Sequence, residues 1–377
     1  MISLARASLL YEWRRYLAAV LAVAFSGLLV LVQLALLIGM FGTVAVYIDE
    51  SGADLWVGFT GTQSIDLGKP VNGQIETRLR AHPQVTKVEP FIFAQSDWRT
   101  PQGRNLYAYL LGIDPDRDAM AFSKVLTPAE RAALLEPMTV IIDASDREKL
   151  GVDVGGRAEM GGRGVKVVAV VEGLRAIGGV NVLTSMRSAR IIDGSIARDM
   201  QEVSYFLLGL AAGANAETVR AELSPPGPVV RFQVWTAREF SHHSQLYWLT
   251  ESGAGAGFAF STLLGLLVGI IITSQTLMGA IMASIREYAT LRALGVSRAS
   301  LAAVVIEQSL WIGAIGLSIT AVCAWLVGAV AHHLRVAMEF PAWAIWVTVG
   351  ITLSVAVLSG LAALRALGHA DPAALLR

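Results

Sequence analysis

The stretch LAAVLAVAFSGLLVLVQLALLIGMFGTVAV, residues 17–46, contains no charged residue. A helix needs about 20 consecutive apolar residues to cross a bilayer, so this stretch is long enough to span one. It is too long for the apolar region of a secretory signal, and no cleavage site with small residues follows it closely. We therefore expect a membrane anchor that the protein retains.

Three further apolar stretches, residues 255–283, 301–331 and 342–364, follow near the C-terminal end, and their one charged residue is Glu307. They explain why 54% of the 377 residues are hydrophobic and only 16% are charged, because soluble proteins carry about 25% charged residues. The pattern predicts four membrane spans, one ahead of a long segment of ordinary composition and three behind it.

Charged residues beside the spans predict the orientation. Asp49, Glu50 and Asp54 follow the first span, whereas arginines gather at the other ends of the spans. These arginines are Arg6, Arg14, Arg15, Arg286, Arg292, Arg298, Arg365 and Arg377. Because basic residues accumulate on the cytoplasmic side, we expect both termini in the cytoplasm of a multi-pass protein of the inner (cytoplasmic) membrane.

The predicted organisation assigns every residue to a segment. The segments are a cytoplasmic N-terminus with the first span (1–46), an extracytoplasmic domain (47–251), the second span (252–283), a cytoplasmic loop (284–300), the third span (301–331), a short external turn (332–341), the fourth span (342–364) and a cytoplasmic tail (365–377).

The long segment between the first and second spans has the composition of a soluble domain. Short β-like runs at residues 139–143, 166–171 and 229–234 alternate with turn residues. Helical patterns at residues 71–81 and 127–135 intervene, and the second begins with Thr127, Pro128 and Glu130, a typical helix start. The expected fold is therefore an α-helical membrane protein with four transmembrane helices (one plus three) and a large mixed α+β extracytoplasmic domain.

The composition also argues against several classes of protein. A net charge of zero from 30 basic and 30 acidic residues lacks the basic surplus of nucleic-acid-binding proteins. Cys323 is the one cysteine, so no intrachain disulfide is possible. A phosphate-binding P-loop requires Gly-x-x-x-x-Gly-Lys-Ser/Thr, and the nearest sequence, Gly68-Lys69, is followed by Pro70.

The histidine pairs do not have the pattern of a metal site. His242 with His243 and His332 with His333 are adjacent in sequence, whereas the zinc-protease motif places its histidines four residues apart on one helix face. Surface or interfacial histidines are the favoured interpretation, and a haem contact is the minor alternative. We expect no catalytic residue and no metal ligand in this chain.

The cytoplasmic loop carries the most informative motif, Arg286-Glu287-Tyr288-Ala289-Thr290-Leu291-Arg292-Ala293-Leu294-Gly295. Good helix formers lead to Gly295, which is suited to ending a helix. Tyr288, Leu291 and Leu294 recur at a spacing of three and form a narrow apolar stripe. From periodicity alone, a helix lying at the membrane interface explains the motif equally well.

This motif, continued through Glu307, resembles the signature of the FtsX-like permeases, the group that includes MacB, the LolC and LolE proteins, DevC and HrtB. The tail Asp371-Pro372 through Leu376-Arg377 is similar to the Asp-Pro-x-x-x-Leu-Arg ending of that family. Residues 140–171 resemble the core of the MacB-like external domain, and residues 53–57 are most similar to DevC-type members. The chain is thus identified as a member of the type VII ABC permeases, nearest to the four-span DevC and HrtB types.

The resemblance implies a function and partners. It implies an ABC exporter permease that forms a homodimer and docks two copies of a separate ATPase, which binds the ATP and Mg²⁺, while this chain binds no cofactor. The docking helix would use Arg286, Glu287, Tyr288, Leu291, Arg292, Leu294 and Gly295. Motion of this helix would pass to the external domain by mechanotransmission and extrude a lipophilic substrate such as a lipid, glycolipid, haem or drug. A periplasmic adaptor and an outer-membrane channel are further expected partners, besides membrane lipid.

Three residues within the spans have expected structural or coupling roles. Glu307 lies close to the cytoplasmic end of the third span, where we favour a structural ion pair near the coupling helix. Gly265 and Gly269 form a small-xxx-small step, which allows helices to approach closely. We expect this step to make a packing contact within or between subunits.

Two alternatives come from other functional classes. FtsX itself resembles this family but controls cell-wall hydrolases through its external loop, and the roughly two-hundred-residue segment here is large for that role. Peptide-resistance permeases linked to two-component sensors usually carry ten spans. Only four spans are predicted here, and an FtsX-type regulatory module that controls a cell-wall hydrolase stays the alternative to export.

Overall fold

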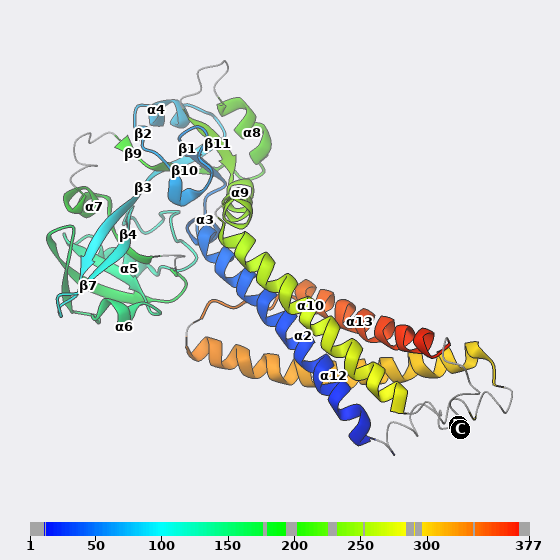
Figure 1. Ribbon diagram of the computed structural model, residues 1–377. Helices are drawn as coiled ribbons and strands as arrows, with labels where there is room; N and C mark the ends of the chain where they lie inside the picture. Colours follow the sequence, from blue (N-terminus) through cyan, green and yellow to red (C-terminus); the bar gives the residue numbers. More distant parts are fainter. Residues whose placement is uncertain are drawn as a thin grey trace. The chain divides into compact units, whose positions relative to one another are not determined.

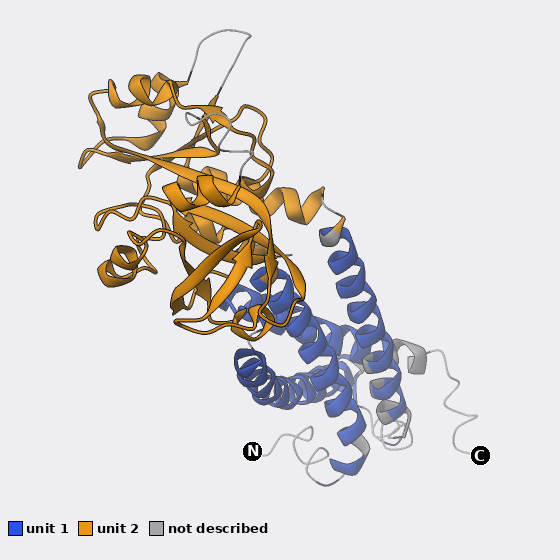
Figure 2. Ribbon diagram, turned by 90° about the vertical axis from the view of Figure 1, so that its left-hand side faces the viewer, with its two compact units in different colours: residues 1–39, 255–377 blue, residues 40–254 orange. Residues whose placement is uncertain are grey.

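The computed structural model of the protein (Figure 1) describes residues 11, 13–175, 179–193, 202–224, 232–251, 253–283, 290, 296–334 and 336–368. The chain divides into two compact units, one of residues 1–39 and 255–377 and the other of residues 40–254 (Figure 2). We call them the helical unit and the inserted domain.

The helical unit contains four long helices. They are α2 (Trp13–Gly42), α10 (Ala254–Ala283), α12 (Arg298–His333) and α13 (Ala342–Gly368). Each is long and apolar enough to cross a membrane, which confirms the four predicted spans. A small buried core that includes Tyr16, Val23, Leu301, Ile312 and Ala356 joins α2, α12 and α13.

The described strands of the inserted domain form a nine-stranded sheet with the order β11-β1-β10-β3-β4-β8-β5-β7-β6. The strands are β1 (Leu55–Gly58), β3 (Val85–Arg99), β4 (Asn105–Ile113), β5 (Thr139–Asp143), β6 (Arg157–Met160), β7 (Arg163–Val171), β8 (Val180–Ser185), β10 (Tyr205–Leu210) and β11 (Gln233–Thr236). A separate pair consists of β2 (Val71–Asn72) and β9 (Glu202–Val203). The mixed α+β prediction for this domain is confirmed.

The long strand β3 belongs to two parts of the sheet. Its first half, up to Phe91, pairs with β10, and its second half, from Ile92, pairs with β4. Because Trp98 and Arg99 of β3 also pair with β6, the strands β3-β4-β8-β5-β7-β6 close into a barrel. We call this barrel the barrel lobe, and β11, β1, β10 and the first half of β3 the sheet lobe.

Short helices accompany each lobe (Figure 1). The sheet lobe carries α4 (Ile75–Arg80) and α8 (Ala216–Leu223), and the barrel lobe carries α5 (Pro128–Ala133), α6 (Arg147–Leu150) and α7 (Met186–Ile192). The remaining helical segments are η1 (Thr43–Ala45), α3 (Val46–Asp49), η2 (Ile65–Leu67) and α9 (Ala237–Thr250).

The two faces of the sheet are packed differently, since alternate residues of a strand point to opposite faces. One face has a single shared core, to which both lobes contribute. It includes Tyr47, Trp56, Phe91, Leu111, Phe122, Ile141, Leu183, Tyr205, Trp235 and Phe240. The opposite face has two separate cores, the sheet-lobe core around Leu55, Val57 and Phe206 and the barrel core around Leu110, Val140 and Val182.

Most of the secondary structure predicted from the sequence is present. The predicted strand at residues 139–143 is β5, and residues 166–171 lie in β7. Thr127 and Glu130 form a reciprocal capping box at the start of α5. Of the strand predicted at residues 229–234, residues 229–231 lie outside the described residues, and β11 begins at Gln233.

The helix predicted at residues 71–81 is wrong in its first part. Val71 and Asn72 form β2 and pair with Val203 and Glu202 of β9. The Asn72 side chain accepts a hydrogen bond from the Gln74 backbone N–H, an interaction that stabilises a turn instead of a helix. The helix α4 therefore begins only at Ile75.

Candidate coupling site

The predicted ATPase-docking residues lie outside the described residues. They are Arg286, Glu287, Tyr288, Leu291, Arg292, Leu294 and Gly295. Downstream of them, Ser297 caps α12, because its side chain accepts a hydrogen bond from the backbone N–H of Ser300. The role of the motif therefore stays a prediction.

The predicted small-xxx-small step faces α2 of the same chain. A Cβ atom added to Gly265 would press on the Leu29 side chain, and one added to Gly269 would lie 2.8 Å from Cβ of Ser26. A polar contact joins the same two helices, since Gln33 Nε2 donates to Ser261 Oγ at 3.0 Å. In lipid, small residues and such hydrogen bonds take the place of the hydrophobic drive to associate.

Helix α12 is also hydrogen-bonded to α2, because Thr320 Oγ1 donates to the carbonyl oxygen of Ala24 at 3.0 Å. Glu307 also lies on α12, nine residues beyond Arg298, and is half-buried. The residues next to it, Gln308 and Ser309, are buried. The proposed ion pair of Glu307 stays a prediction.

The inserted domain has two connectors, which are the places where the chain enters it and leaves it. The first connector is residues 40–49, which contain η1 and α3 and continue the chain from α2. The second connector is α9, which precedes α10. Within the domain the two connectors pack against each other.

The second connector is anchored by Phe240, whose side chain is fully buried. Its ring stacks on Trp235 of β11, with ring centres 4.6 Å apart and planes 11° from parallel. It also lies 6.1 Å from Trp56 of β1 and 5.7 Å from Tyr205 of β10. Aromatic pairs at such distances contribute stability beyond their buried area. One side chain thus ties α9 to three strands of the sheet lobe.

Hydrogen bonds hold the second connector to η2 as well. The Ile65 backbone N–H donates to Ser244 Oγ at 3.2 Å, and Trp248 Nε1 donates to Asp66 Oδ1 at 3.1 Å. Tyr205 donates its hydroxyl proton to the carbonyl oxygen of Ile65 at 2.6 Å, and burial raises the pKa of this tyrosine well above its ordinary value. The hydroxyl therefore stays neutral and remains a donor.

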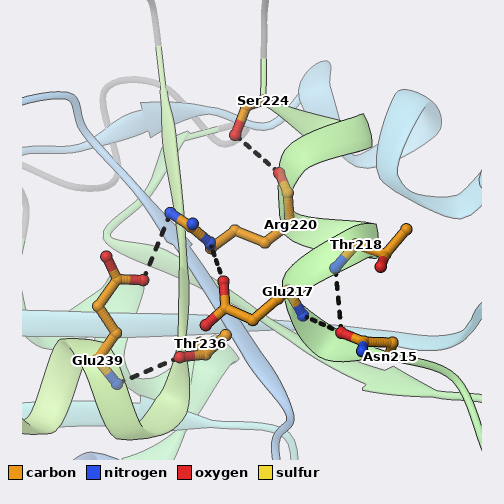
Figure 3. A network of polar contacts seen from close by, with 7 residues as sticks. All are labelled: Asn215, Glu217, Thr218, Arg220, Ser224, Thr236 and Glu239. Atoms are coloured by element: carbon orange, nitrogen blue, oxygen red, sulfur yellow. Dashed lines mark hydrogen bonds and ion pairs between the residues drawn. The ribbon is translucent and has the colours of Figure 1, made fainter.

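A polar network fixes the first turn of the second connector (Figure 3). Thr236 Oγ1 caps α9 by accepting from the Glu239 backbone N–H at 3.2 Å. Arg220 of α8 makes ion pairs with Glu217 at 2.8 Å and with Glu239 at 3.6 Å. This arginine therefore joins α8 of the sheet lobe to the start of α9.

The first connector is anchored by Tyr47, which is buried. Its hydroxyl group donates to Asn181 Oδ1 of β8 at 2.9 Å, and its ring lies 5.0 Å from Phe93 and 6.4 Å from Phe122, edge to face. The Asn181 amide in turn donates to the carbonyl oxygen of Leu174 at 2.6 Å. These contacts reach into the barrel lobe.

The segment 119–124, which we call the strap, is hydrogen-bonded to the chain at the end of the first connector. The Gly52 N–H donates to the carbonyl oxygen of Met120 at 2.9 Å, and the Lys124 N–H donates to that of Glu50. Within the strap, Phe122 has a φ of 51°, which an aromatic residue rarely adopts. Such a conformation persists only where the surrounding contacts hold it.

Two buried charged residues hold the strap. The Glu89 carboxylate accepts hydrogen bonds from the backbone N–H groups of Met120 and Ala121, and Arg131 donates to the carbonyl oxygen of Ala121. Burial raises the pKa of Glu89 and lowers the pKa of Arg131. The hydrogen bonds oppose the shift for Glu89, because they stabilise the ionised carboxylate.

The histidine pairs show no common site. His242 and His243 are exposed on α9, and His332 and His333 are exposed at the end of α12. Among the described residues, no group of three or more His, Cys, Asp or Glu side chains could hold a metal ion.

Sequence reasoning missed the connectors as functional elements. Tyr47 and Phe240 look like ordinary core aromatics in the sequence, since no fixed spacing relates them to Asn181, Trp56 or Trp235. The available signal was their position, because both lie close to the ends of predicted spans. The first span runs through η1 and α3 directly into a packed aromatic core, and such a dense core can transmit movement.

Comparisons with known proteins give two family matches. The MacB-like periplasmic core domain matches residues 16–225, more than half of the 377 residues. The FtsX-like permease C-terminal region matches residues 259–372. No curated protein matches the sequence.

Solved structures with low sequence identity also match. The periplasmic region of MacB from Actinobacillus actinomycetemcomitans is 12% identical, with a TM-score of 0.37, and the match covers 52% of this chain and 94% of that one. The extracellular domain of the ABC-type transporter YknZ from Gram-positive bacteria is 14% identical, with a TM-score of 0.35, over 49% of this chain and 99% of that one.

Proposed function

This chain belongs to the family of ABC transporter permeases that combine a MacB-like periplasmic core domain with an FtsX-like C-terminal region, and on that premise we propose that it transmits ATP-driven motion to its inserted domain. The domain would lie outside the cytoplasm and both termini inside, in the inner membrane. The chain is then a transport subunit with a mechanical role, and the chemistry of ATP hydrolysis belongs to its partner.

The observation that supports this proposal is the construction of the two connectors. Each span-derived segment enters the inserted domain through a buried aromatic anchor, Tyr47 in one case and Phe240 in the other. Packed protein interiors are dense and transmit displacement. A shift of α2 along its axis would therefore move the strands of the domain through η1, α3 and Tyr47. A shift of α10 would reach α9 through residues 251–253, where Gly253 has a φ of 76°.

The proposed assembly contains two copies of this chain and two copies of a separate ATPase that binds ATP and Mg²⁺. The loop at residues 284–300 would dock into the ATPase, with Leu291 and Leu294 as apolar anchors and Arg286 or Arg292 at the rim. The cargo would be a lipophilic molecule, such as a lipid, glycolipid, haem or drug. A periplasmic adaptor and an outer-membrane channel would complete the path.

The decisive experiment removes the apolar anchors. We expect the double variant Leu291→Ala, Leu294→Ala to lose co-purification with the ATPase, because truncating central apolar anchors typically costs about 2 kcal/mol or more. Tyr288→Asp should act in the same way by placing an unpaired charge in the contact. The measurement is the amount of ATPase that co-elutes, together with ATP hydrolysis in lipid.

Arg298→Ala is the matched control, since Arg298 is the first residue of α12 and lies beyond the motif. It should retain most ATPase binding. Normal binding and hydrolysis in the double variant would show that the loop is an interfacial helix, and the proposed coupling would then be wrong.

The location of the inserted domain has its own test. In a Cys323→Ser background, Glu148→Cys places one thiol at an exposed position of α6. We expect a membrane-impermeant maleimide to label it in intact spheroplasts. Labelling that requires lysis would reverse the orientation.

A further inference from the structure

The sheet-lobe core and the barrel core, on the face of the sheet opposite the shared core, have few residues in common. Met186, the first residue of α7, is a partly buried residue that packs against both the sheet-lobe core and the barrel core. The shared core on the other face contains large side chains from both lobes. The hydrophobic core is therefore continuous between the lobes on one face of the sheet and divided between them on the other.

The division coincides with the change of partner along β3. Pro90 sits just before this change and has no N–H to donate. At the change itself, Ser204 replaces regular strand pairing: its hydroxyl accepts from the Phe93 N–H at 2.8 Å and donates to the Phe93 carbonyl oxygen at 3.0 Å. One hydroxyl group thus bridges the end of the β10 pairing and the start of the β4 pairing.

Tyr47, the anchor of the first connector, contacts one side of this division. Tyr47 contacts Asn181 of β8 and Phe93 in the second half of β3, and both belong to the barrel lobe. Asn181 continues to Leu174, whose N–H donates to Asp143 of β5 at 2.7 Å. A hydrogen-bonded path therefore runs from the first connector across the barrel wall.

The second connector is bound to the other side. Phe240 contacts β11, β1 and β10 through its aromatic neighbours, and the Ala237 N–H donates to the carbonyl oxygen of Asp54 at 3.0 Å. The Arg220–Glu239 pair adds α8. All of these elements belong to, or immediately precede, the sheet lobe.

We propose that β3 is a hinge about which the two lobes rotate. The two connectors would move different lobes: the first connector moves the barrel lobe, and the second moves the sheet lobe. Sliding of the first connector against the second would then change the angle between the two lobes. This proposal rests on the proposed function for the source of the motion, but the hinge and the assignment of connectors to lobes can be tested without the ATPase.

The first test measures the distance between the lobes in the full-length Cys323→Ser protein in lipid nanodiscs without nucleotide. Spin labels are placed at Thr77→Cys on α4 and Glu148→Cys on α6, one in each lobe. A second pair, Thr77→Cys and Thr218→Cys, lies within the sheet lobe. Each pair is compared in Met186→Leu, which keeps the apolar contact, and Met186→Ser, which removes it.

We expect Met186→Ser to add a second, longer distance between the labels on different lobes and to leave the distance within the sheet lobe unchanged. An unchanged distance between the lobes would show that the domain is rigid and would contradict the proposed hinge. Equal broadening of both distances would mean general loosening and would also contradict it.

The second test uses hydrogen exchange by mass spectrometry on the same full-length protein. Tyr47→Phe removes the hydroxyl donor to Asn181 and should speed exchange in β5 and β8 while leaving β1 and β10 unchanged. Phe240→Leu should do the reverse. If either variant speeds exchange equally in both lobes, the connectors do not drive separate lobes. Failure of ATPase binding, by contrast, would refute the proposed function and leave these results standing.

Discussion

Phe240 and Phe260 are separated by twenty residues and have opposite environments. Phe240 in the inserted domain is fully buried, whereas Phe260 on α10 is 63% exposed. Trp235 and Trp346 differ in the same way, with 2% and 73% exposure. In water, burial of apolar surface drives folding, but lipid tails solvate apolar side chains as well as another helix does. The same residue type therefore stabilises the two units by different means.

Polar side chains show the complementary difference. In the helical unit, small hydroxyl groups make contacts between helices, for example Ser274 with Ser359 at 2.7 Å. In the inserted domain, a charged carboxylate, that of Glu89, is buried and satisfied by two backbone N–H groups. The helical unit is held by close approach of small residues, and the inserted domain by large side chains and a few essential polar contacts.

The largest expected effect comes from the two phenylalanines. We expect Phe240→Ala to lower the free energy of unfolding of the inserted domain by about 3–5 kcal/mol, because it leaves a cavity among Trp56, Tyr205 and Trp235. Phe260→Ala should change it little, since this side chain leaves no cavity. Urea unfolding of the solubilised chain, followed by pulse proteolysis, measures both. Equal losses of unfolding free energy in the two variants would show that the different environments of Phe240 and Phe260 have no effect on stability.

The next effect concerns the glycines of α10. We expect Gly269→Ala to destabilise the helical unit by about 1–3 kcal/mol, because the new methyl group meets Cβ of Ser26, which cannot rotate away. Gly265→Ala should cost less, since it meets the flexible end of Leu29. Unfolding by SDS in mixed micelles measures how strongly each variant destabilises the helical unit.

Gly279→Ala is the control for this series, because a Cβ atom there meets nothing within 4 Å. It should be neutral or slightly stabilising, since alanine favours helix more than glycine does. If all three variants behaved alike, close packing of α10 on α2 would not hold the unit together.

A third prediction concerns Glu89. Glu89→Gln leaves at least one of the N–H groups of Met120 and Ala121 without an acceptor, and an unsatisfied buried donor costs about 1–3 kcal/mol. Glu89→Asp, which keeps the charge but shortens the side chain, is the comparison variant. Urea unfolding at neutral pH should give both variants a lower free energy of unfolding than the unchanged protein. A free energy equal to that of the unchanged protein would contradict the prediction.

The same residue predicts a pH dependence. Burial raises the pKa of Glu89 above its ordinary value of 4.5, so the folded state holds this proton more tightly than the unfolded state. Its contribution to stability is therefore greatest below pH 4.5 and declines as the pH rises through the raised pKa. The difference in unfolding free energy between the unchanged protein and Glu89→Gln, measured across this range, should follow that slope. A difference independent of pH would contradict it.

The smallest effect is expected at the surface of α8. Arg220 and Glu239 are both partly exposed, and exposed ion pairs contribute about 0.2–1 kcal/mol. Arg220→Ala should lower the unfolding free energy by that amount, and less at high salt, since salt screens exposed charges. Arg220→Lys is the control. A loss as large as that of Phe240→Ala would mean that this pair, and not the aromatic anchor, holds the second connector.

The four spans, the α+β nature of the inserted domain and several of its elements were predictable from the sequence. Long uncharged stretches have one common explanation, and β5 and the capping box of Thr127 and Glu130 depend on residues close together in the chain. The strand at Val71 was mispredicted because its partner, Val203, lies far along the chain. The docking motif at residues 286–295 was found by resemblance and stays a prediction.

What the sequence determined by itself was local or compositional: which segments are apolar enough to enter a membrane, and where helices begin. Only the tertiary structure decided that β3 serves two lobes, that β6 closes the barrel by pairing with Trp98, and that Tyr47 and Phe240 anchor in different lobes. The physical reason is that hydropathy and capping act over a few neighbouring residues, whereas the contacts of a buried aromatic ring are set by strands from distant parts of the chain. An alternating strand shows that one face is buried, but not which core that face joins.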